Sequence, residues 1–248
     1  VIPFAIITIL ALAFFLWSSY GRIRLLTLGK KENRFDHFGN RILYMLFFAF
    51  GQWRVIKKPF GLNHFILFWG FIFLGIANIE FLLNGLFPKS ISLSRLPEGV
   101  FQTLTYIFDI ASLVVLIAVV VAACRRLIFP PPHIGARSRD AFVILSLVAI
   151  LMIAFFMLHA GEIAQSEVTA PQYLPVSDLV ATNILADLST SALDFLVNFS
   201  WWIHAVVLLS FLNYLPYSKH LHILTAVPNC FFKSPDIVCT QPREEFVP

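Results

Sequence analysis

Apolar runs long enough to cross a bilayer dominate this chain, and the run at residues 201–223 also carries three histidines. A transmembrane helix needs about 20 apolar residues, and an ionisable side chain inside one is costly, which points to function. His204 and His222 are separated by about five turns of a continuous α-helix, or about 27 Å. We therefore expect both imidazoles on one helix face, one near each side of a hydrocarbon core about 30 Å thick.

Imidazole is a common axial ligand of b-type haem, so two stacked haems are the working hypothesis for this helix. The third histidine, His220, would point about 160° away from His204 by the same helix geometry. Because it adjoins Lys219, we interpret His220 as a base at the protein surface. The haem hypothesis requires partner histidines from elsewhere in the chain.

The composition is that of an integral membrane protein. Hydrophobic residues make up 58% of the 248 residues and charged residues only 13%, against about a quarter charged in soluble proteins. The formal net charge of +4 could suggest a nucleic-acid partner. The basic residues instead adjoin the apolar runs, which is the pattern of membrane topology. We therefore expect no nucleic-acid partner.

The apolar runs predict an all-α fold with five transmembrane helices. The predicted spans are residues 2–20, 61–86, 101–128, 141–160 and 193 to about 222. Two shorter segments complete the fold. Residues 42–50 are too short to cross and predict an interfacial or re-entrant helix, and residues 179–188 predict an amphipathic cap in an acidic loop.

The distribution of basic residues predicts the orientation. Sixteen of the eighteen lysines and arginines fall after the first and third spans and in the C-terminal tail. Under the positive-inside rule, the N-terminus lies outside and the C-terminus lies in the cytoplasm. We expect a multi-pass protein of a bacterial or archaeal cytoplasmic membrane.

The depth of each histidine along its span predicts two pairs, one near each surface of the membrane. His64 and His222 fall near the inner surface, and His159 and His204 fall about 27 Å higher, near the outer surface. Four histidines at two levels predict two haems b in a haem-binding bundle. Two plainer interpretations stay open: His64 caps or flanks a helix start, and His159 binds water or Glu162.

Other side chains suggest a quinone site and a partner surface. Glu162, Glu80 and Asn78 lie near the outer level and could supply a proton to quinone, although Glu80 is more typical of a snorkelling or helix-end carboxylate. The basic insert at residues 21–60 could dock an acidic partner or contact anionic membrane lipid. The three cysteines (Cys124, Cys230 and Cys239) show no CxxC spacing, so we expect no iron–sulfur cluster in this segment.

Several stretches resemble the gamma subunit of respiratory nitrate reductase, a five-helix dihaem cytochrome b. The resemblance is carried by PYSKHLHI at 216–223 with His204 before it, by NHF at 63–65, and by the connection at 125–147. It implies that His64 and His222 ligate an inner haem and that His204 ligates an outer one. The family's fourth ligand position is Leu74 here, so the resemblance leaves the outer site to His159 or removes it.

The insert, with GQWR and KKPFGLNHFILFWGF, is more similar to the membrane domain of heterodisulfide-reductase-like, electron-transfer-flavoprotein:menaquinone oxidoreductases. That resemblance implies a cytochrome b domain at residues 1–228 and a cytoplasmic tail at 229–248 that leads to an iron–sulfur partner. A flavoprotein would lie beyond that partner.

The combined hypothesis is a membrane subunit of a quinone-linked oxidoreductase in a respiratory chain. It would carry electrons between a cytoplasmic iron–sulfur protein and menaquinone or ubiquinone through two haems. Two alternatives stay open at this point: a single-haem cytochrome b of the same kind, and a haem-free membrane anchor or transporter.

Overall fold

The computed structural model describes residues 2–29, 33–88, 91–129, 138–168 and 171–233, and these ranges contain helices and turns but no strand. The α-helices are α1 (Ile2–Ile23), α2 (Phe38–Tyr44), α3 (Trp53–Ile56), α4 (Gly61–Leu86), α5 (Glu98–Ile128), α6 (Arg139–Ala164), α7 (Pro175–Ile184), α8 (Thr190–Tyr214) and α9 (His222–Phe231). A π-helix occupies Met45–Phe50, and 3-10 turns occupy Arg24–Leu28, Leu93–Arg95, Pro171–Tyr173, Leu215–Tyr217 and Lys219–Leu221.

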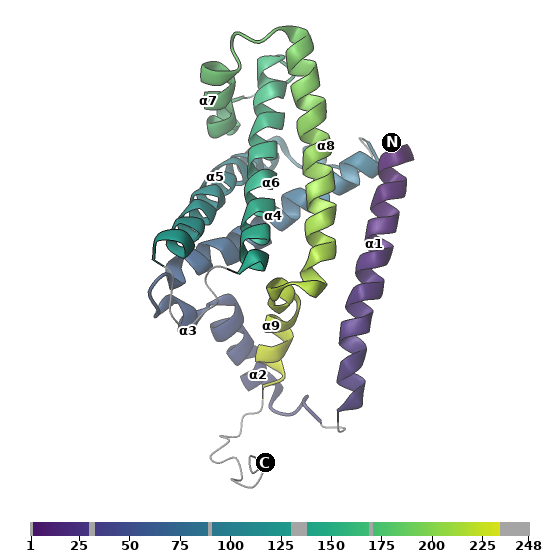
Figure 1. Ribbon diagram of the computed structural model, residues 1–248, viewed down its shortest axis with the longest axis vertical. Coiled ribbons are helices and arrows are strands. Elements are labelled where there is room, and N and C mark those ends of the chain that lie inside the picture. Colours follow the sequence, from purple (N-terminus) through teal and green to yellow (C-terminus); the bar gives the residue numbers. More distant parts are fainter. Residues whose placement is uncertain (1, 30–32, 89–90, 130–137, 169–170, 234–248) are drawn as a thin grey trace.

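Five of these helices are long and apolar enough to cross a membrane: α1, α4, α5, α6 and α8. They confirm the five predicted runs, and α4 has the predicted bounds. The long helices fit a multi-pass membrane protein. Helix α7 lies where the sequence predicts the amphipathic cap, beside one end of α6 and α8 (Figure 1).

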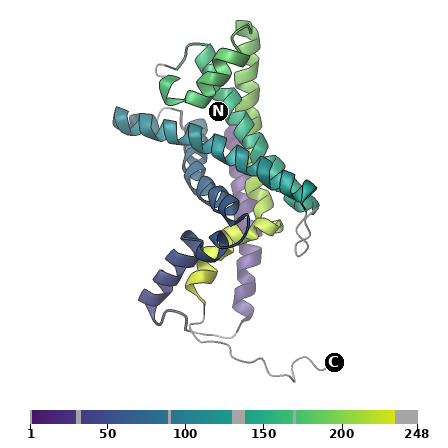
Figure 2. The same cartoon turned by 90° about the vertical axis from the view of Figure 1, so that its left-hand side faces the viewer.

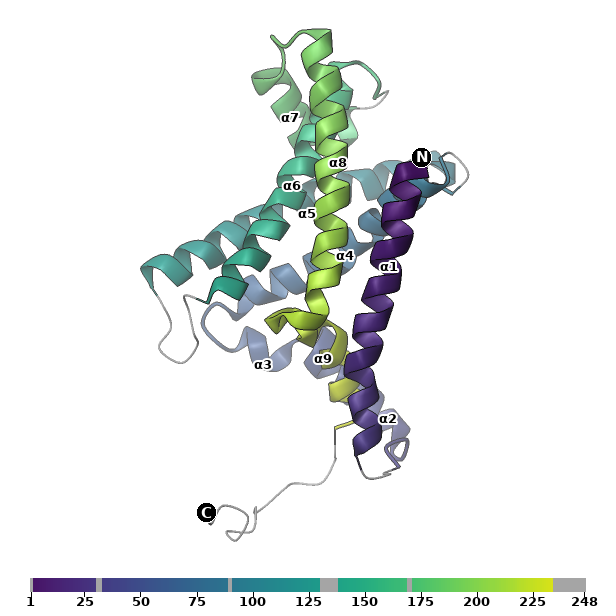
Figure 3. The ribbon, with the colours of Figure 1, turned by 45° about the vertical axis from the view of Figure 1, so that its right-hand side comes forward.

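Helices α6 and α8 pack side by side, and α1 runs along α8 (Figure 3). Gly161 on α6 allows the close approach, because a β-carbon there would lie 2.6 Å from Cγ2 of Val197 on α8. Small residues are the usual means by which membrane helices approach each other. Helices α4 and α5 cross this pair obliquely.

The main apolar core lies where α4, α5 and α6 meet. Its buried members are Leu74, Phe108, Val115, Val119, Leu151 and Met152. Leu74 is only 5% exposed. The position that resembles a haem-ligand position is therefore occupied by a packing residue.

A buried carboxylate fastens α7 to α5. Asp109 has no exposed surface, and its Oδ2 accepts a hydrogen bond from the backbone N–H of Val176 (2.6 Å) while Oδ1 accepts from the Ser177 hydroxyl (2.7 Å). Both donors are in the first turn of α7, where backbone N–H groups have no partner within the helix. Asp109 therefore caps α7 from a neighbouring span.

The long final helix predicted to reach His222 is wrong. Helix α8 ends at Tyr214, and His222 begins the separate helix α9. Pro216 lacks the N–H that would continue the helix, and its ring clashes with the preceding turn. Ser218 is extended (φ −99°, ψ 171°), and its hydroxyl accepts a hydrogen bond from the backbone N–H of His220.

The insert between α1 and α4 forms a compact helical unit. Helix α2 continues directly into the π-helix, and α3 follows after Gly51 and Gln52. The unit packs against α9 at one end of the molecule (Figure 2). The short helix predicted at residues 42–50 thus spans the end of α2 and the π-helix.

Arg41 joins the insert to α9. Its side chain is 3% exposed, and its guanidinium donates to the Asp36 carboxylate (2.6 Å) and to the backbone carbonyls of Phe231 (3.2 Å) and Lys233 (2.6 Å). The last carbonyls of a helix lack partners within it, so Arg41 satisfies the C-terminus of α9. The hydrogen bond from Arg41 holds the pKa of Asp36 below its ordinary value.

Some predicted features lie outside the described residues. These are Cys239 and most of the predicted tail at 229–248, and part of the basic insert at 30–32. Within the described ranges, Cys124 is exposed and Cys230 is half-buried, and neither forms a disulfide.

Candidate functional site

His64 and His222 come together as the sequence predicts, although His222 lies on the separate helix α9 and not on the last span. His64 lies in the first turn of α4 and His222 in the first turn of α9. Their ring centres are 6.2 Å apart, and the ring planes are inclined by 34°. The structure thus pairs two imidazoles from opposite ends of the chain.

Each imidazole of this pair is oriented through Nδ1. Nδ1 of His64 lies 2.9 Å from Oε1 of Gln52, and Nδ1 of His222 lies 2.9 Å from the Lys219 carbonyl. Both partners are oxygens that accept only, so each Nδ1 carries the hydrogen and each Nε2 keeps its lone pair. Metal-binding histidines usually show this arrangement, because the outer hydrogen bond fixes the tautomer and raises ligand basicity.

The separation of the two rings suits a metal bound between them. With about 2 Å from metal to each nitrogen and about 1.2 Å from nitrogen to ring centre, two opposed imidazoles would have ring centres about 6.4 Å apart. The observed 6.2 Å is close to that value. The ring separation is therefore compatible with an iron that His64 and His222 would hold between them, as in a b-type haem.

Gln52 was missed from the sequence. It is 5% exposed and adopts a left-handed backbone conformation (φ 48°) between the π-helix and α3. Gly61 brings this segment against α4, because a β-carbon there would overlap the Val55 carbonyl. The GQWR motif could have pointed to Gln52, because a buried polar residue between two short helices needs a hydrogen-bond partner.

His220 is half-buried rather than fully exposed, so its interpretation as a surface base needs correction. Its ring centre is 5.3 Å from that of His222, and its Nδ1 is buried without a hydrogen-bond partner among the described residues. Burial, followed by the nearby charge of His222, lowers the pKa of His220 to about 4. His220 is therefore a neutral imidazole at neutral pH.

Asp140 at the start of α6 fixes the corner that carries His220 and His222. Its carboxylate accepts hydrogen bonds from the Tyr214 hydroxyl (2.6 Å) and from the backbone N–H of Lys219 (3.0 Å). These contacts tie the end of α8 to the 3-10 turn before α9. The position of His222 therefore depends on α6 as well as on its own segment.

At the other level, His204 is buried on α8 and pairs with Asn78 of α4. Its Nε2 lies 2.9 Å from Oδ1 of Asn78, and the ring packs against Phe81 with centres 4.6 Å apart. An amide oxygen accepts, so the lone pair of His204 is on Nδ1. That nitrogen is buried and has no hydrogen-bond partner of ordinary length in the described part of the chain, although the backbone of Leu151 on α6 lies near this histidine.

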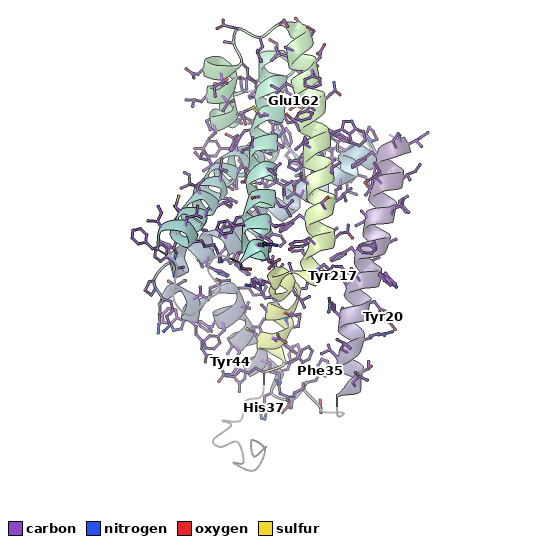
Figure 4. All side chains as sticks on the ribbon, in the orientation of Figure 1. Tyr20, Phe35, His37, Tyr44, Glu162 and Tyr217 are labelled. Carbon is purple, nitrogen blue, oxygen red and sulfur yellow. The ribbon has the colours of Figure 1, made fainter. Side chains whose placement is uncertain are left out.

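His159 on α6 faces the same region, near enough to His204 for the two to interact electrostatically. Its Nδ1 lies 2.8 Å from the Glu162 carboxylate, and the two side chains are 29% and 30% exposed. Nδ1 is therefore engaged by Glu162, and Nε2 is the nitrogen left for another partner. Glu162 lies at the end of the molecule opposite Tyr44 and His37 (Figure 4).

The three predicted quinone-site residues have distinct contacts. Asn78 and Glu162 each orient an outer histidine. Glu80 uses both carboxylate oxygens to hold a loop, accepting from the Ser92 hydroxyl (2.8 Å) and from the backbone N–H of Leu93 (2.7 Å). Glu80 thus holds a loop, whereas Asn78 and Glu162 lie beside imidazoles.

Comparisons with known proteins add two curated relatives. The probable iron-sulfur-binding oxidoreductase FadF of Bacillus subtilis is 29% identical over 231 residues, covering 92% of this chain and 32% of FadF. The EtfAB:quinone oxidoreductase of Syntrophomonas wolfei is 26% identical over 239 residues, covering 92% of this chain and 33% of that protein. The chain therefore spans about a third of the length of these relatives.

No family model and no solved structure matches the chain. The two relatives support a relationship to oxidoreductases linked to quinone and to iron–sulfur proteins. They do not support the resemblance to the nitrate reductase gamma subunit.

Proposed function

We propose that this chain is the membrane part of a quinone-linked oxidoreductase and carries electrons through b-type haem. The observation that carries the proposal is the His64–His222 pair, with ring centres 6.2 Å apart and both Nδ1 hydrogens bonded to oxygen. A haem held there would supply one-electron redox chemistry. The chain itself supplies the axial nitrogens and fixes their orientation.

The relatives support the wider setting of this proposal. One is named for iron–sulfur binding and the other for EtfAB and quinone. By likeness, we propose an iron–sulfur protein or domain as the cytoplasmic partner, with a flavoprotein beyond it. The excess of lysine and arginine after the first and third spans favours an outer N-terminus and an inner C-terminus.

A second haem at the outer level is supported by His204. Its buried Nδ1 lacks a hydrogen-bond partner of ordinary length among the described residues, and His159 on the facing helix uses Nδ1 toward Glu162, which leaves Nε2 for another partner. His159 would take the ligand role that Leu74 cannot fill. If this second site is absent, the protein is a single-haem cytochrome.

We propose that quinone exchanges electrons at the outer end. Glu162 and His159 form a partly exposed pair with oxygen and nitrogen 2.8 Å apart, close enough to share a proton. Quinone reduction requires protons, and a carboxylate beside an imidazole can hold one and pass it on. Both residues extend from the end of α6, so their position is set by a rigid helix.

The test is haem content per polypeptide, measured from a reduced-minus-oxidised visible spectrum of the purified protein. The dihaem proposal expects two haems in the wild type and one in His222→Asn. His37→Asn, which changes an exposed histidine at a left-handed position that asparagine tolerates, should leave the content unchanged.

Other outcomes separate the alternatives. One haem in the wild type, lost in His222→Asn, would indicate a single inner site. A well-folded wild type without haem would reject the cytochrome and favour an anchor or a transporter. Unchanged haem content in His222→Asn would refute the His64–His222 pairing.

A further inference from the structure

The insert carries an open groove of about 480 Å³, lined by Asn40, Leu43, Tyr44, Phe47, Phe48 and Trp53. We call it the aromatic groove. Its residues come from α2, the π-helix and α3, and π-helices frequently occur at functional sites. The histidine pairs described above do not include any of these residues.

The aromatic groove is an exposed apolar surface. Phe47 is 61% exposed and Trp53 56% exposed, and Tyr44 and Phe48 stack with ring centres 5.7 Å apart. In a chain with membrane spans, an exposed apolar surface needs lipid or a partner to cover it. The insert joins the end of one span to the start of the next, so the groove lies at the level of the membrane surface.

Three cations cover rings of this groove. The Arg54 guanidinium lies 4.8 Å from the centre of the Phe48 ring, and Lys57 Nζ lies 4.5 Å from the Trp53 ring. The third, Lys233 from beyond α9, has its Nζ 5.2 Å from the Tyr44 ring. The groove is therefore apolar along its floor and positively charged at its rim.

The rim charges are available to an external anion. Among the residues that the structure describes, no carboxylate forms an ion pair with Arg54, Lys57 or Lys233. The sequence of the insert, residues 21–60, contains nine lysines and arginines against two acidic residues. A ligand for this surface should combine an apolar chain with a negative head group.

We propose that the aromatic groove binds an anionic phospholipid of the inner leaflet. Its acyl chain would lie along Tyr44, Phe47 and Phe48, and its phosphate would lie between Arg54 and Lys57. Aromatic side chains are enriched at the membrane interface, and basic residues there attract anionic lipid. This site does not depend on haem.

The test uses quenching of tryptophan fluorescence by lipids with brominated acyl chains, added to the full chain in detergent micelles. Trp53 is one of five tryptophans, so Trp53→Phe measures the share of quenching that arises in the groove. We expect saturable, Trp53-dependent quenching by phosphatidylglycerol at a lower mole fraction than by phosphatidylcholine. Arg54→Gln/Lys57→Gln should raise the half-saturating fraction roughly 30-fold, at about fivefold per charge.

The matched control is Arg22→Gln/Arg24→Gln, which removes two charges from the same insert outside the groove and should shift half-saturation little. Circular dichroism checks that each variant is folded. Equal quenching of Trp53 by both lipids would overturn the proposal, because the groove would then be an unselective membrane surface. Release of the lipid by inorganic phosphate, but not by chloride at equal ionic strength, would also overturn it in favour of a free phosphate site. Absence of Trp53 quenching by either lipid would assign this face to another occupant, such as an acidic protein.

Discussion

Replacing Gln52 tests whether the inner histidine is tuned through its outer hydrogen bond. Gln52→Leu removes the oxygen that lies 2.9 Å from Nδ1 of His64 but keeps a side chain of similar size. Loss of such a partner typically costs 10–100-fold in metal affinity, or about 1.4–2.7 kcal/mol. The backbone at this position is left-handed with either residue, so strain changes little.

The expected redox effect has a definite sign. In the proposed inner haem site, the hydrogen bond would make His64 a more basic ligand, which favours oxidised iron, so Gln52→Leu should raise the midpoint potential of that haem. A tenfold loss confined to the oxidised state corresponds to about 59 mV for one electron. Gln52→Glu places a charged acceptor at the same atom and should lower the potential.

The assay is a redox titration of haem absorbance, together with haem retained per polypeptide. Gln102→Leu is the matched control, because among the described residues the side chain of Gln102 bonds the nearby Glu98 and lies away from both histidine pairs. The reasoning is refuted if Gln52→Leu behaves like the control in both measurements, or if Gln52→Leu and Gln52→Glu shift the potential in the same direction.

Three further predictions concern the scaffold. Asp109→Ala should release α7, because it removes two buried hydrogen bonds worth about 0.5–1.5 kcal/mol each. Amide exchange in α7 should rise about tenfold, and unchanged exchange would contradict the capping role. Arg41→Ala should separate the insert from α9 and speed maleimide labelling of the half-buried Cys230, whereas an unaltered rate would show that α9 is held by other contacts. Gly161→Leu should lower stability by about 1–3 kcal/mol in thermal unfolding, because its β-carbon meets Val197; adding Val197→Ala should restore part of the loss, and no rescue would place the clash elsewhere.

The sequence predicts the spans well because length and hydropathy are local properties. Helix α4 has the predicted bounds, Gly61–Leu86. The end of α8 was predicted wrongly because the apolar span was extended through residues 215–222. Pro216 was the signal that should have ended the helix, since proline cannot donate the next backbone hydrogen bond.

The partners of the histidines could be predicted only in part. His64 and His222 lie side by side, as their predicted depth requires, and His159 contacts Glu162, which was the plainer of its two interpretations. Asn78 lies 126 residues from its partner His204, and no local pattern specifies such a contact. Asp109 was missed for the same reason, because its partners are 67 and 68 residues away.

Because the chain breaks between α8 and α9, His204 and His222 are not carried by one rigid helix. A rotation of the upper part of α8 would move His204, whereas His222 is also held from α6 through Asp140 and from the insert through Arg41, so the two histidines are not rigidly coupled. Substitutions around one level can therefore accumulate in evolution without compensating changes at the other. In a single continuous helix, by contrast, any change of register would displace both imidazoles together.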